Sequence, residues 1–276
     1  MSLLTLSEWL RCPICFHDLE PRPPLALACE AGHAFDVNKR GYVTLLGPSA
    51  GKLHSDTAAM LDERQRFLDT GAYAPLSDVL TEIVAERMPR RVLDVGCGTG
   101  YYLSGVLSRC RDVRSLAMDL SPAAVARTAR RSASVDGLVA DVWSPLPIRD
   151  GASDVILNVF APRNPAEFHR VLAPGGALAV VVPADDHLQE LRDAGLLIDV
   201  RPGKAEQLRQ SLGDLFSLDA EHGIRSTLTL DSVAVAALIG MGPSAHHAAG
   251  RALPDASQVT ASFRLLLFGR RDAVAS

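Results

Sequence analysis

The chain has 276 residues, of which 47% are hydrophobic and 22% are charged, a composition that supports a sizeable core and excludes a disordered protein. The net charge of −4 excludes a general, charge-driven nucleic-acid binder. The longest apolar runs, such as residues 176–184, are shorter than the roughly 20 residues that a membrane helix needs.

Three of the five cysteines lie within the first 30 residues. Cys12, Cys15, Cys29 and His33 form the pattern C-x2-C-x13-C-x3-H. Two short knuckles with two ligands each provide the tetrahedral set of soft or borderline donors that zinc prefers. We therefore predict a structural zinc site, closed because all four ligands come from the protein. His17 is a weaker rival for the fourth position, and the alternative is reduced thiols that never meet.

A segment of about 45 residues buries little core by itself, and a metal would compensate for this. The sequence before Cys12 has no basic segment and no small-residue cleavage site, so we expect a cytoplasmic protein. We predict a zinc-binding module at residues 1–45, a linker and helix at 46–72, and a main domain at 73–276. The linker helix is expected to start with a cap at residues 55–57 and to end near residue 69.

A glycine-rich turn follows the first strand of the main domain, in "RRVLDVGCGTG" at residues 90–100. Elements then alternate: helix 101–109, strand 114–119, helix 122–131, strands 135–141 and 154–160, helix 165–172 and strand 176–183. This alternation predicts an α/β fold with a doubly wound parallel sheet. Strands at 223–230 and 259–271, on either side of a helix at 232–240, are expected to add an antiparallel hairpin.

Asp94 precedes the glycines Gly96, Gly98 and Gly100, which form G-x-G-x-G rather than the dinucleotide fingerprint G-x-G-x-x-G. Together with "DLS" at 119–121, "VADV" at 139–142 and "PGG" at 174–176, this pattern resembles the Rossmann-like class I S-adenosylmethionine-dependent methyltransferases. An NAD enzyme is the alternative. The resemblance implies that Asp94 and the glycines surround the methionyl part, that Asp119 binds the ribose hydroxyls and that Asp141 lies near the adenine. The cofactor-binding residues expected on this basis are Asp94, Gly96, Gly98, Gly100, Tyr102, Asp119, Leu120, Asp141, Val142 and Asn158.

Longer stretches of sequence restrict this resemblance to one family of methyltransferases. "CPIC", "CEAGHAFDVNKRGYVTLL", "RQRFLDTGAYAPL" and "NVFAPRNPAEFHRVLAPGG" occur in the order found in RlmA/TlrB-type 23S ribosomal RNA guanine-N1 methyltransferases. The resemblance covers residues 12 to about 190. It implies methylation of one guanine in a hairpin loop of 23S rRNA by a homodimer, and the Ala- and Arg-rich composition favours the branch linked to resistance against tylosin-type macrolides.

RNA recognition of this kind requires a loop base that can be splayed out and held in a pocket. "NVFAP" at 158–162 follows the fourth strand, so we expect Asn158, Phe160 and Pro162 to hold the target base. No side chain stands out as a general base. The expected RNA-binding residues are Lys39, Arg40, Lys52, Arg64, Arg66, Tyr73 and Arg163.

Six arginines between residues 109 and 131 predict either a basic patch or a solvated helix face. Two other functions remain open from the sequence. A methyltransferase of small molecules would share every cofactor motif, and an RNA-binding assembly factor would retain the fold without catalysis.

Overall fold

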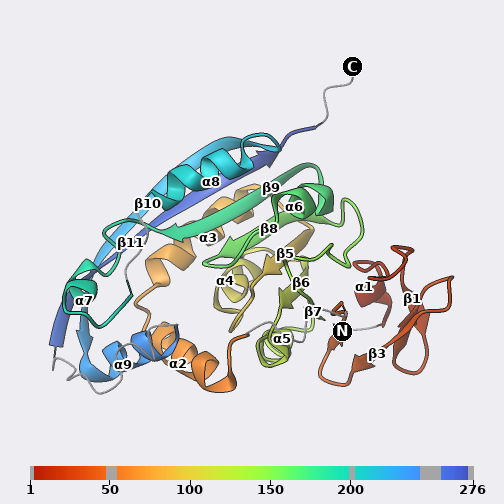
Figure 1. The fold of residues 1–276 in the computed structure, drawn as a ribbon, viewed down its shortest axis with the longest axis horizontal. Helices are drawn as coiled ribbons and strands as arrows, with labels where there is room; N and C mark the ends of the chain where they lie inside the picture. Colours follow the sequence, from red (N-terminus) through yellow and green to blue (C-terminus); the bar gives the residue numbers. More distant parts are fainter. Residues whose placement is uncertain (1–2, 48–54, 199–202, 243–255, 273–276) are drawn as a thin grey trace.

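The computed structural model describes residues 3–47, 55–198, 203–242 and 256–272. Its strands join one mixed sheet in the order β1-β2-β3-β4-β7-β6-β5-β8-β9-β11-β10 (Figure 1). The strands are β1 (Glu20–Arg22), β2 (Ala26–Ala28), β3 (Ala34–Asn38), β4 (Tyr42–Thr44), β5 (Arg91–Val95), β6 (Arg114–Asp119), β7 (Val135–Val139), β8 (Ser153–Val159), β9 (Leu172–Pro183), β10 (Phe216–Asp231) and β11 (Ala256–Arg270).

The helices follow the predicted starts closely where a capping residue is present. Thr57, Ser121 and Asn164 each accept a hydrogen bond from a backbone N–H of the first turn and so fix where their helices begin. The helices are α1 (Leu3–Ser7), α2 (Ala58–Asp69), α3 (Ala74–Glu86), α4 (Tyr101–Arg109), α5 (Pro122–Ala129), α6 (Pro165–Val171), α7 (Gln189–Asp193), α8 (Lys204–Leu212) and α9 (Ser232–Gly240). Among the described residues, none of these helices is long and apolar enough to cross a membrane.

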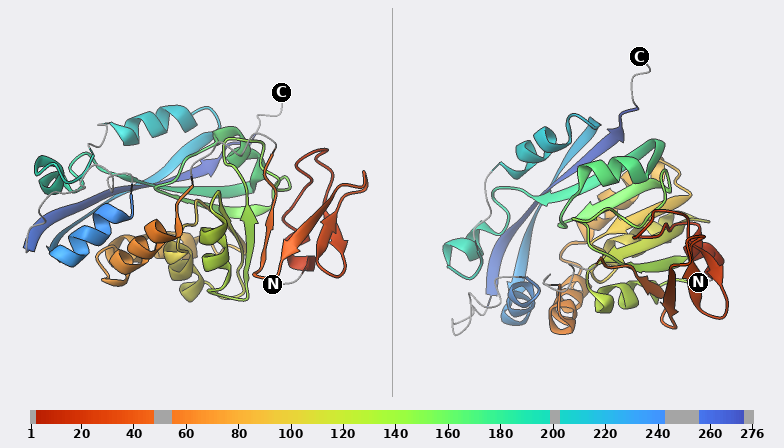
Figure 2. Two further views of the ribbon diagram at one scale, coloured as in Figure 1. Left: turned by 60° about the horizontal axis from the view of Figure 1, so that its bottom comes forward. Right: turned by 45° about the vertical axis from the view of Figure 1, so that its right-hand side comes forward.

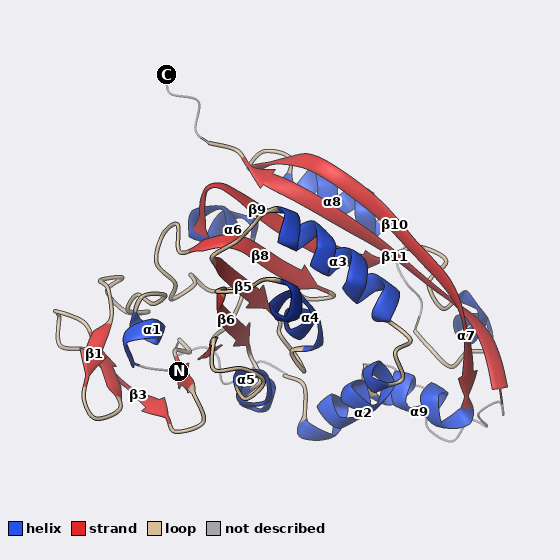
Figure 3. Cartoon of the chain, turned by 180° about the vertical axis from the view of Figure 1, so that it is seen from behind, coloured by secondary structure: helices blue, strands red, loops and turns tan. Residues whose placement is uncertain are grey.

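The helices cover both faces of the sheet (Figure 3). Both faces need this cover because both are apolar. In β5, for example, Val92 packs on one face and Leu93 on the other. Helices α3, α4 and α5 cover the first face, whereas α6 and α8 cover the second. The predicted doubly wound α/β fold is confirmed.

The N-terminal segment is built into this sheet and not merely attached to it. Tyr42–Thr44 pairs in parallel with β7, and β3 pairs with β4, so the small strands extend the central sheet. Trp9 and Leu10, which are buried, belong to the same apolar core as Leu116 and Leu138 of the central strands. The module expected at residues 1–45 therefore shares its hydrophobic core with the main domain.

The C-terminal strands form the predicted antiparallel hairpin, which is longer than expected. β10 and β11 pair over their whole length and curve away from the rest of the sheet (Figure 2), while β11 also pairs with β9. Helix α9 lies between them in sequence and packs against α2. Helices α7 and α8 were not predicted, and they connect β9 to this hairpin.

Candidate functional site

The four residues of the metal pattern come together. Their ligand atoms all lie within 4.8 Å of one another. The Sγ atoms of Cys15 and Cys29 are 3.6 Å apart, and Nδ1 of His33 is 3.4 Å from Sγ of Cys29 and 3.6 Å from Sγ of Cys12. Donors about 2.3 Å from one tetrahedral centre lie roughly 3.7 Å apart, so this set of three sulfurs and one nitrogen fits zinc.

Backbone geometry explains why the knuckles converge. Gly32 has φ 87° and donates its N–H to the carbonyl of Cys29, which turns the chain so that His33 faces the thiols. Cys12 and Cys29 are buried. His17, the weaker rival, lies outside the cluster, with its Nδ1 3.2 Å from Oε1 of Glu30.

A second site lies at the carboxyl ends of β5, β6, β7 and β8. There, a cavity of about 1120 Å³, which we call the cofactor cavity, opens between the sheet, α2 and α9. Sites for one small molecule usually occupy roughly 300–1,000 Å³, so the volume suits a cofactor and part of a second molecule. Of the residues predicted to bind cofactor, those lining it are Asp94, Gly96, Gly98, Tyr102, Asp119, Leu120, Asp141 and Val142.

The glycines of the loop permit close packing. Gly96 has φ 78°, and a Cβ added there would lie 2.4 Å from Cβ of Ala161. Gly100 has φ 73° and its missing side chain leaves room for Thr128, at 2.7 Å from the added atom. Gly100 therefore packs behind the cavity wall and does not line it, so its contribution is to the shape of the loop.

The acidic residues are held by backbone donors. Asp119 accepts from the N–H of Gly98 at 3.0 Å on one oxygen and from the N–H of Ser121 at 2.9 Å on the other. Asp141 accepts from the N–H of Trp143 and the hydroxyl of Ser144. Each carboxylate oxygen keeps a free lone pair, so both groups can accept hydroxyl or amino hydrogens of a nucleoside.

Asp94 is a buried residue of the cavity wall, with 4% of its surface exposed. Burial and the nearby charge of Asp119 raise the pKa of Asp94 to about 7. Burial also raises the pKa of Asp119, against the opposing effect of its backbone donors. Two carboxyl groups in a confined cavity are electrostatically suited to a ligand with positive charge, such as a sulfonium with an ammonium group.

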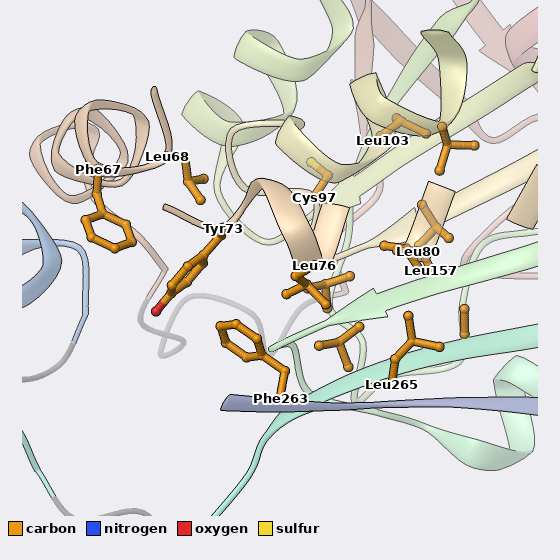
Figure 4. Close-up of a cluster of buried hydrophobic side chains, with 14 of the residues drawn as sticks. Phe67, Leu68, Tyr73, Leu76, Leu80, Cys97, Leu103, Leu157, Phe263 and Leu265 are labelled. Carbon is orange, nitrogen blue, oxygen red and sulfur yellow. The ribbon is translucent and has the colours of Figure 1, made fainter. Parts of the chain in front are cut away.

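The other end of the cavity is aromatic. Tyr73 packs edge-on against Phe67 and Phe263, with ring centroids 5.0 and 4.8 Å away (Figure 4). Phe160 lies 5.5 Å from Phe263 and is 44% exposed, with φ 55°. An exposed ring at the mouth of a cavity next to buried rings can stack on a planar base.

His187 joins this end of the cavity and was not found from the sequence, because it lies in a segment without motif or periodicity. Its Nδ1 accepts from the N–H of Ser262 at 3.2 Å, and its Nε2 lies 3.3 Å from the Tyr73 hydroxyl. Burial, followed by the charges of Arg192 and Lys204, lowers the pKa of His187 to about 4. A neutral ring that accepts at Nδ1 carries its hydrogen on Nε2, so His187 donates to Tyr73.

Asn158, expected at the base or the cofactor, is fully buried and is not part of the cavity wall. Its Nδ2 donates to the carbonyl of Pro162 at 2.9 Å, while Oδ1 has no partner among the described residues. The role that this geometry gives Asn158 is to hold the loop. Phe160 and Pro162 of that loop do line the cavity.

The residues expected to bind RNA are dispersed. Lys39 and Arg40 are exposed at the turn before β4, and Arg66 is exposed and paired with Glu63. Arg64 and Arg163 line the cofactor cavity instead, and so does Tyr73, which is 3% exposed. Lys52 lies outside the described residues.

Arg64 is held in place by its neighbours. It donates from Nη1 to Asp56 at 2.5 Å and from Nη2 to the carbonyl of Met241 at 2.9 Å. An added Cβ on Gly98 would lie 3.1 Å from Nη1 of Arg64, so the guanidinium covers the glycine loop. Arg64 therefore connects α2, the loop and the end of α9 at the mouth of the cavity.

Comparisons with known proteins agree with both sites. Residues 10–52 match the family model of the N-terminal zinc ribbon of RlmA, and residues 92–176 match a methyltransferase domain. The 23S rRNA (guanine(748)-N(1))-methyltransferase of Streptomyces fradiae is 44% identical over 87% of this chain and 86% of its own length. A protein of Micromonospora griseorubida named for 23S rRNA guanine-N1 methylation is 40% identical over 94% of this chain and 97% of its own. The crystal structure of MccD protein, with a TM-score of 0.51 and 13% identity, covers 70% of this chain and 97% of its own, and shows the fold alone.

Proposed function

This chain belongs to the family of the 23S rRNA (guanine-N1)-methyltransferases, and we propose that it methylates N1 of one guanine in a hairpin loop of 23S rRNA. It is an S-adenosylmethionine-dependent enzyme with a zinc ribbon. The observation that carries the proposal is the cofactor cavity, which joins an acidic, glycine-lined end to an aromatic end within one space.

The acidic end fits the cofactor, as the charge and the donor set of Asp94, Asp119 and the glycine loop indicate. When bound, S-adenosylmethionine supplies a methyl group, and its transfer forms the N1–C bond as the S–C bond breaks, leaving S-adenosylhomocysteine and the N1 proton. Asp119 and Asp141 would hold the two halves of the nucleoside portion, and Asp94 would lie near its positive charges.

The aromatic end would hold the extruded guanine. Phe160, exposed at the mouth, would stack on the base, and Pro162 would limit its position from the same loop. Asn158 supports both residues through its hydrogen bond to Pro162. The Tyr73 hydroxyl, whose oxygen accepts from His187, keeps its own hydrogen for donation to a carbonyl oxygen such as guanine O6. Such a donor would stabilise the negative charge that reaches O6 as N1 loses its proton.

Recognition of the loop would involve the zinc ribbon. Lys39 and Arg40 are exposed on its last turn, and Lys52 follows in the sequence. With Arg64, Arg66 and Arg163 near the cavity, these are the proposed phosphate contacts. A homodimer in the cytoplasm is part of the proposal, and sedimentation equilibrium of the purified protein would measure its mass.

The proposed target is the guanine that corresponds to position 748. This is the position given in the name of the Streptomyces fradiae relative. Its 44% identity over most of both chains supports this choice. We propose that methylation there gives resistance to tylosin-type macrolides, which growth of a sensitive host that expresses the chain would measure.

The experiment that tests the reaction uses labelled S-adenosylmethionine and 23S rRNA without its natural modifications. N1-methylguanine blocks the Watson–Crick edge, so reverse transcription should stop at one position in one hairpin loop. Wild-type protein that binds the cofactor but methylates neither free rRNA nor ribosomal particles would contradict the proposal and favour a small-molecule substrate.

A further inference from the structure

The arginine-rich run between residues 109 and 131 separates into two places in the structure. Arg127 and Arg131 pack near the glycine loop, where they bond to Asp62 and to Gln65. The first part of the run instead lines a hollow of about 800 Å³ at the amino ends of β5 and β6. We call this the arginine hollow, and its arginines are Arg90, Arg91, Arg109, Arg111 and Arg114.

The charge of the arginine hollow is poorly compensated. Of its five arginines, only Arg114 has an acidic partner within the described residues, Glu8 at 2.5 Å. The other carboxylate in the wall is Asp112, which is exposed. The side chains of Arg90, Arg109 and Arg111 are exposed and have no hydrogen bond or ion pair to any described residue. A concave site lined by unpaired guanidinium groups is suited to anions with several negative charges.

The arginine hollow lies apart from the cofactor cavity. Arg91 at the start of β5 lines the hollow, whereas Val95 at the end of the same strand lines the cavity. Four residues of strand span about 13 Å. In β6, Arg114 and Met118 repeat this relationship. A nucleotide held in the cavity therefore lies at the opposite edge of the sheet from these arginines.

We propose that the arginine hollow binds backbone phosphates of an RNA segment outside the hairpin loop that contains the target guanine. The inference rests on the proposed function, which supplies a large folded RNA as substrate. Residues at the starts of β5 and β6 and in the segments just before them build the hollow. Glu8, just after α1, connects it to the N-terminal segment that precedes the zinc ribbon. The protein would then contact the RNA at both ends of the parallel strands, the carboxyl ends at the cofactor cavity and the amino ends at the arginine hollow.

Stabilisation of helix ends explains only part of this cluster. Arg109 lies in the last turn of α4, where a cation interacts favourably with the helix dipole. Arg90 and Arg111 lie outside the helices. Arg90 is three residues after the C-cap of α3, and Arg111 is one residue after the C-cap of α4. Their replacement should therefore leave the thermal stability unchanged.

The test compares two RNAs and two double variants. The RNAs are the isolated target hairpin and a longer 23S rRNA fragment that contains this hairpin with its flanking helices. Arg90→Gln/Arg111→Gln removes two charges from the hollow. Arg225→Gln/Arg264→Gln removes two exposed arginines of the β10–β11 hairpin, which are ion-paired with Asp186 and Glu221, as a control matched in charge. Affinity is measured from 50 to 200 mM salt, methylation of both RNAs is followed, and the melting temperature shows that each variant is folded.

For the hollow variant, affinity for the long fragment should fall on the order of tenfold, and the slope of log K against log[salt] should decrease by about 1.5, since each phosphate contact contributes about 0.7–0.9. Methylation of the isolated hairpin should be unchanged, and the control variant should match the wild type. An unchanged slope for the long fragment, or an equal loss on both RNAs, would overturn the inference. Failure of the proposed function would be seen separately, as a wild-type protein that methylates neither RNA.

Discussion

Nδ2 of Asn158 donates to the carbonyl oxygen of Pro162 at 2.9 Å, and this hydrogen bond closes the loop that carries Phe160. Asn158 is fully buried, at the end of β8. Phe160, two residues later, has φ 55°, a conformation that costs a non-glycine residue about 1–2 kcal/mol. The buried amide therefore stabilises a strained loop whose exposed ring faces the cofactor cavity.

Asn158→Asp would place an acceptor opposite the Pro162 carbonyl. At pH 8 the buried carboxylate faces another oxygen, so we expect the variant to lose about 3 kcal/mol of stability and most of its methylation rate. Below the raised pKa of the new carboxyl its proton can donate to Pro162, so stability should recover as the pH falls to about 5. Denaturant unfolding at both pH values measures this. Asn38→Asp is the control, because Asn38 is exposed at the end of β3 and its side chain accepts from the N–H of Arg40. An equal effect in both variants would refute the role of the hydrogen bond.

Phe160→Ala should separate base binding from cofactor binding. Loss of one base–aromatic stack costs about 1–3 kcal/mol. We therefore expect at least a fivefold loss in kcat/KM for RNA, with the affinity for S-adenosylmethionine unchanged in calorimetry. Trp143, which is 66% exposed and lines the cavity beside Asp141, provides the comparison. If Trp143→Ala impairs RNA methylation as much as Phe160→Ala with unchanged cofactor affinity, the base does not lie at the aromatic end.

Gly96→Ala should abolish cofactor binding through the backbone. The new Cβ would lie 2.4 Å from that of Ala161, which forces the loops of β5 and β8 apart. Gly175 has nearly the same φ, 73°, but no heavy atom within 4 Å of an added Cβ. Gly175→Ala should thus cost only about 1 kcal/mol of stability, with unchanged affinity for S-adenosylmethionine. Similar cofactor affinity in both variants would mean that the approach of Ala161 to Gly96 has no part in shaping the site.

Zinc removal should destabilise the whole chain and not only its first residues. Trp9 and Leu10 share a core with the central strands, and β4 pairs with β7. We expect one zinc per chain by elemental analysis and its loss in Cys12→Ser. The melting temperature should fall by about 10 °C or more, because structural zinc contributes several kcal/mol and each kcal/mol corresponds to about 2–4 °C. Cys110→Ser, at the end of α4, should keep both the zinc and the stability; a Cys12→Ser protein that melts like wild type would show that the ribbon is independent.

The sequence was most informative where chemistry fixes spacing. The ligand spacing of Cys12, Cys15, Cys29 and His33 predicted their convergence. The cap expected at residues 55–57 located the start of α2, where Thr57 provides it. The same reasoning could not reach His187, because its contacts with Tyr73 and Ser262 bring together residues 114 and 75 positions apart in the chain. Nothing local in the sequence encodes such a contact.

Asn158 shows a second limit of the sequence. A polar residue at the end of a strand indicates a ligand contact, yet here tertiary packing turns the amide inward to Pro162. The arginine-rich run between residues 109 and 131 shows a third limit of the sequence. Charge patterning predicted a basic patch or a solvated helix face, whereas the structure places Arg111, just after α4, in the arginine hollow and Arg127, in α5, beside Asp62.

The titration of Asp94 gives the last prediction. Its pKa is about 7 in the folded protein and about 3.8 when unfolded, so between these values the folded state binds the extra proton. Stability relative to Asp94→Asn should accordingly fall as the pH rises from 4 to 7, by on the order of 3 kcal/mol, and remain constant above that. The positive charges of S-adenosylmethionine favour the ionised carboxylate, so cofactor binding near pH 7 should release protons from the wild type and not from the variant. Calorimetry in buffers of different ionisation enthalpy measures that release. Equal proton release from both proteins, or a wild-type stability that runs parallel to the variant's from pH 4 to 8, would place the titrating group elsewhere.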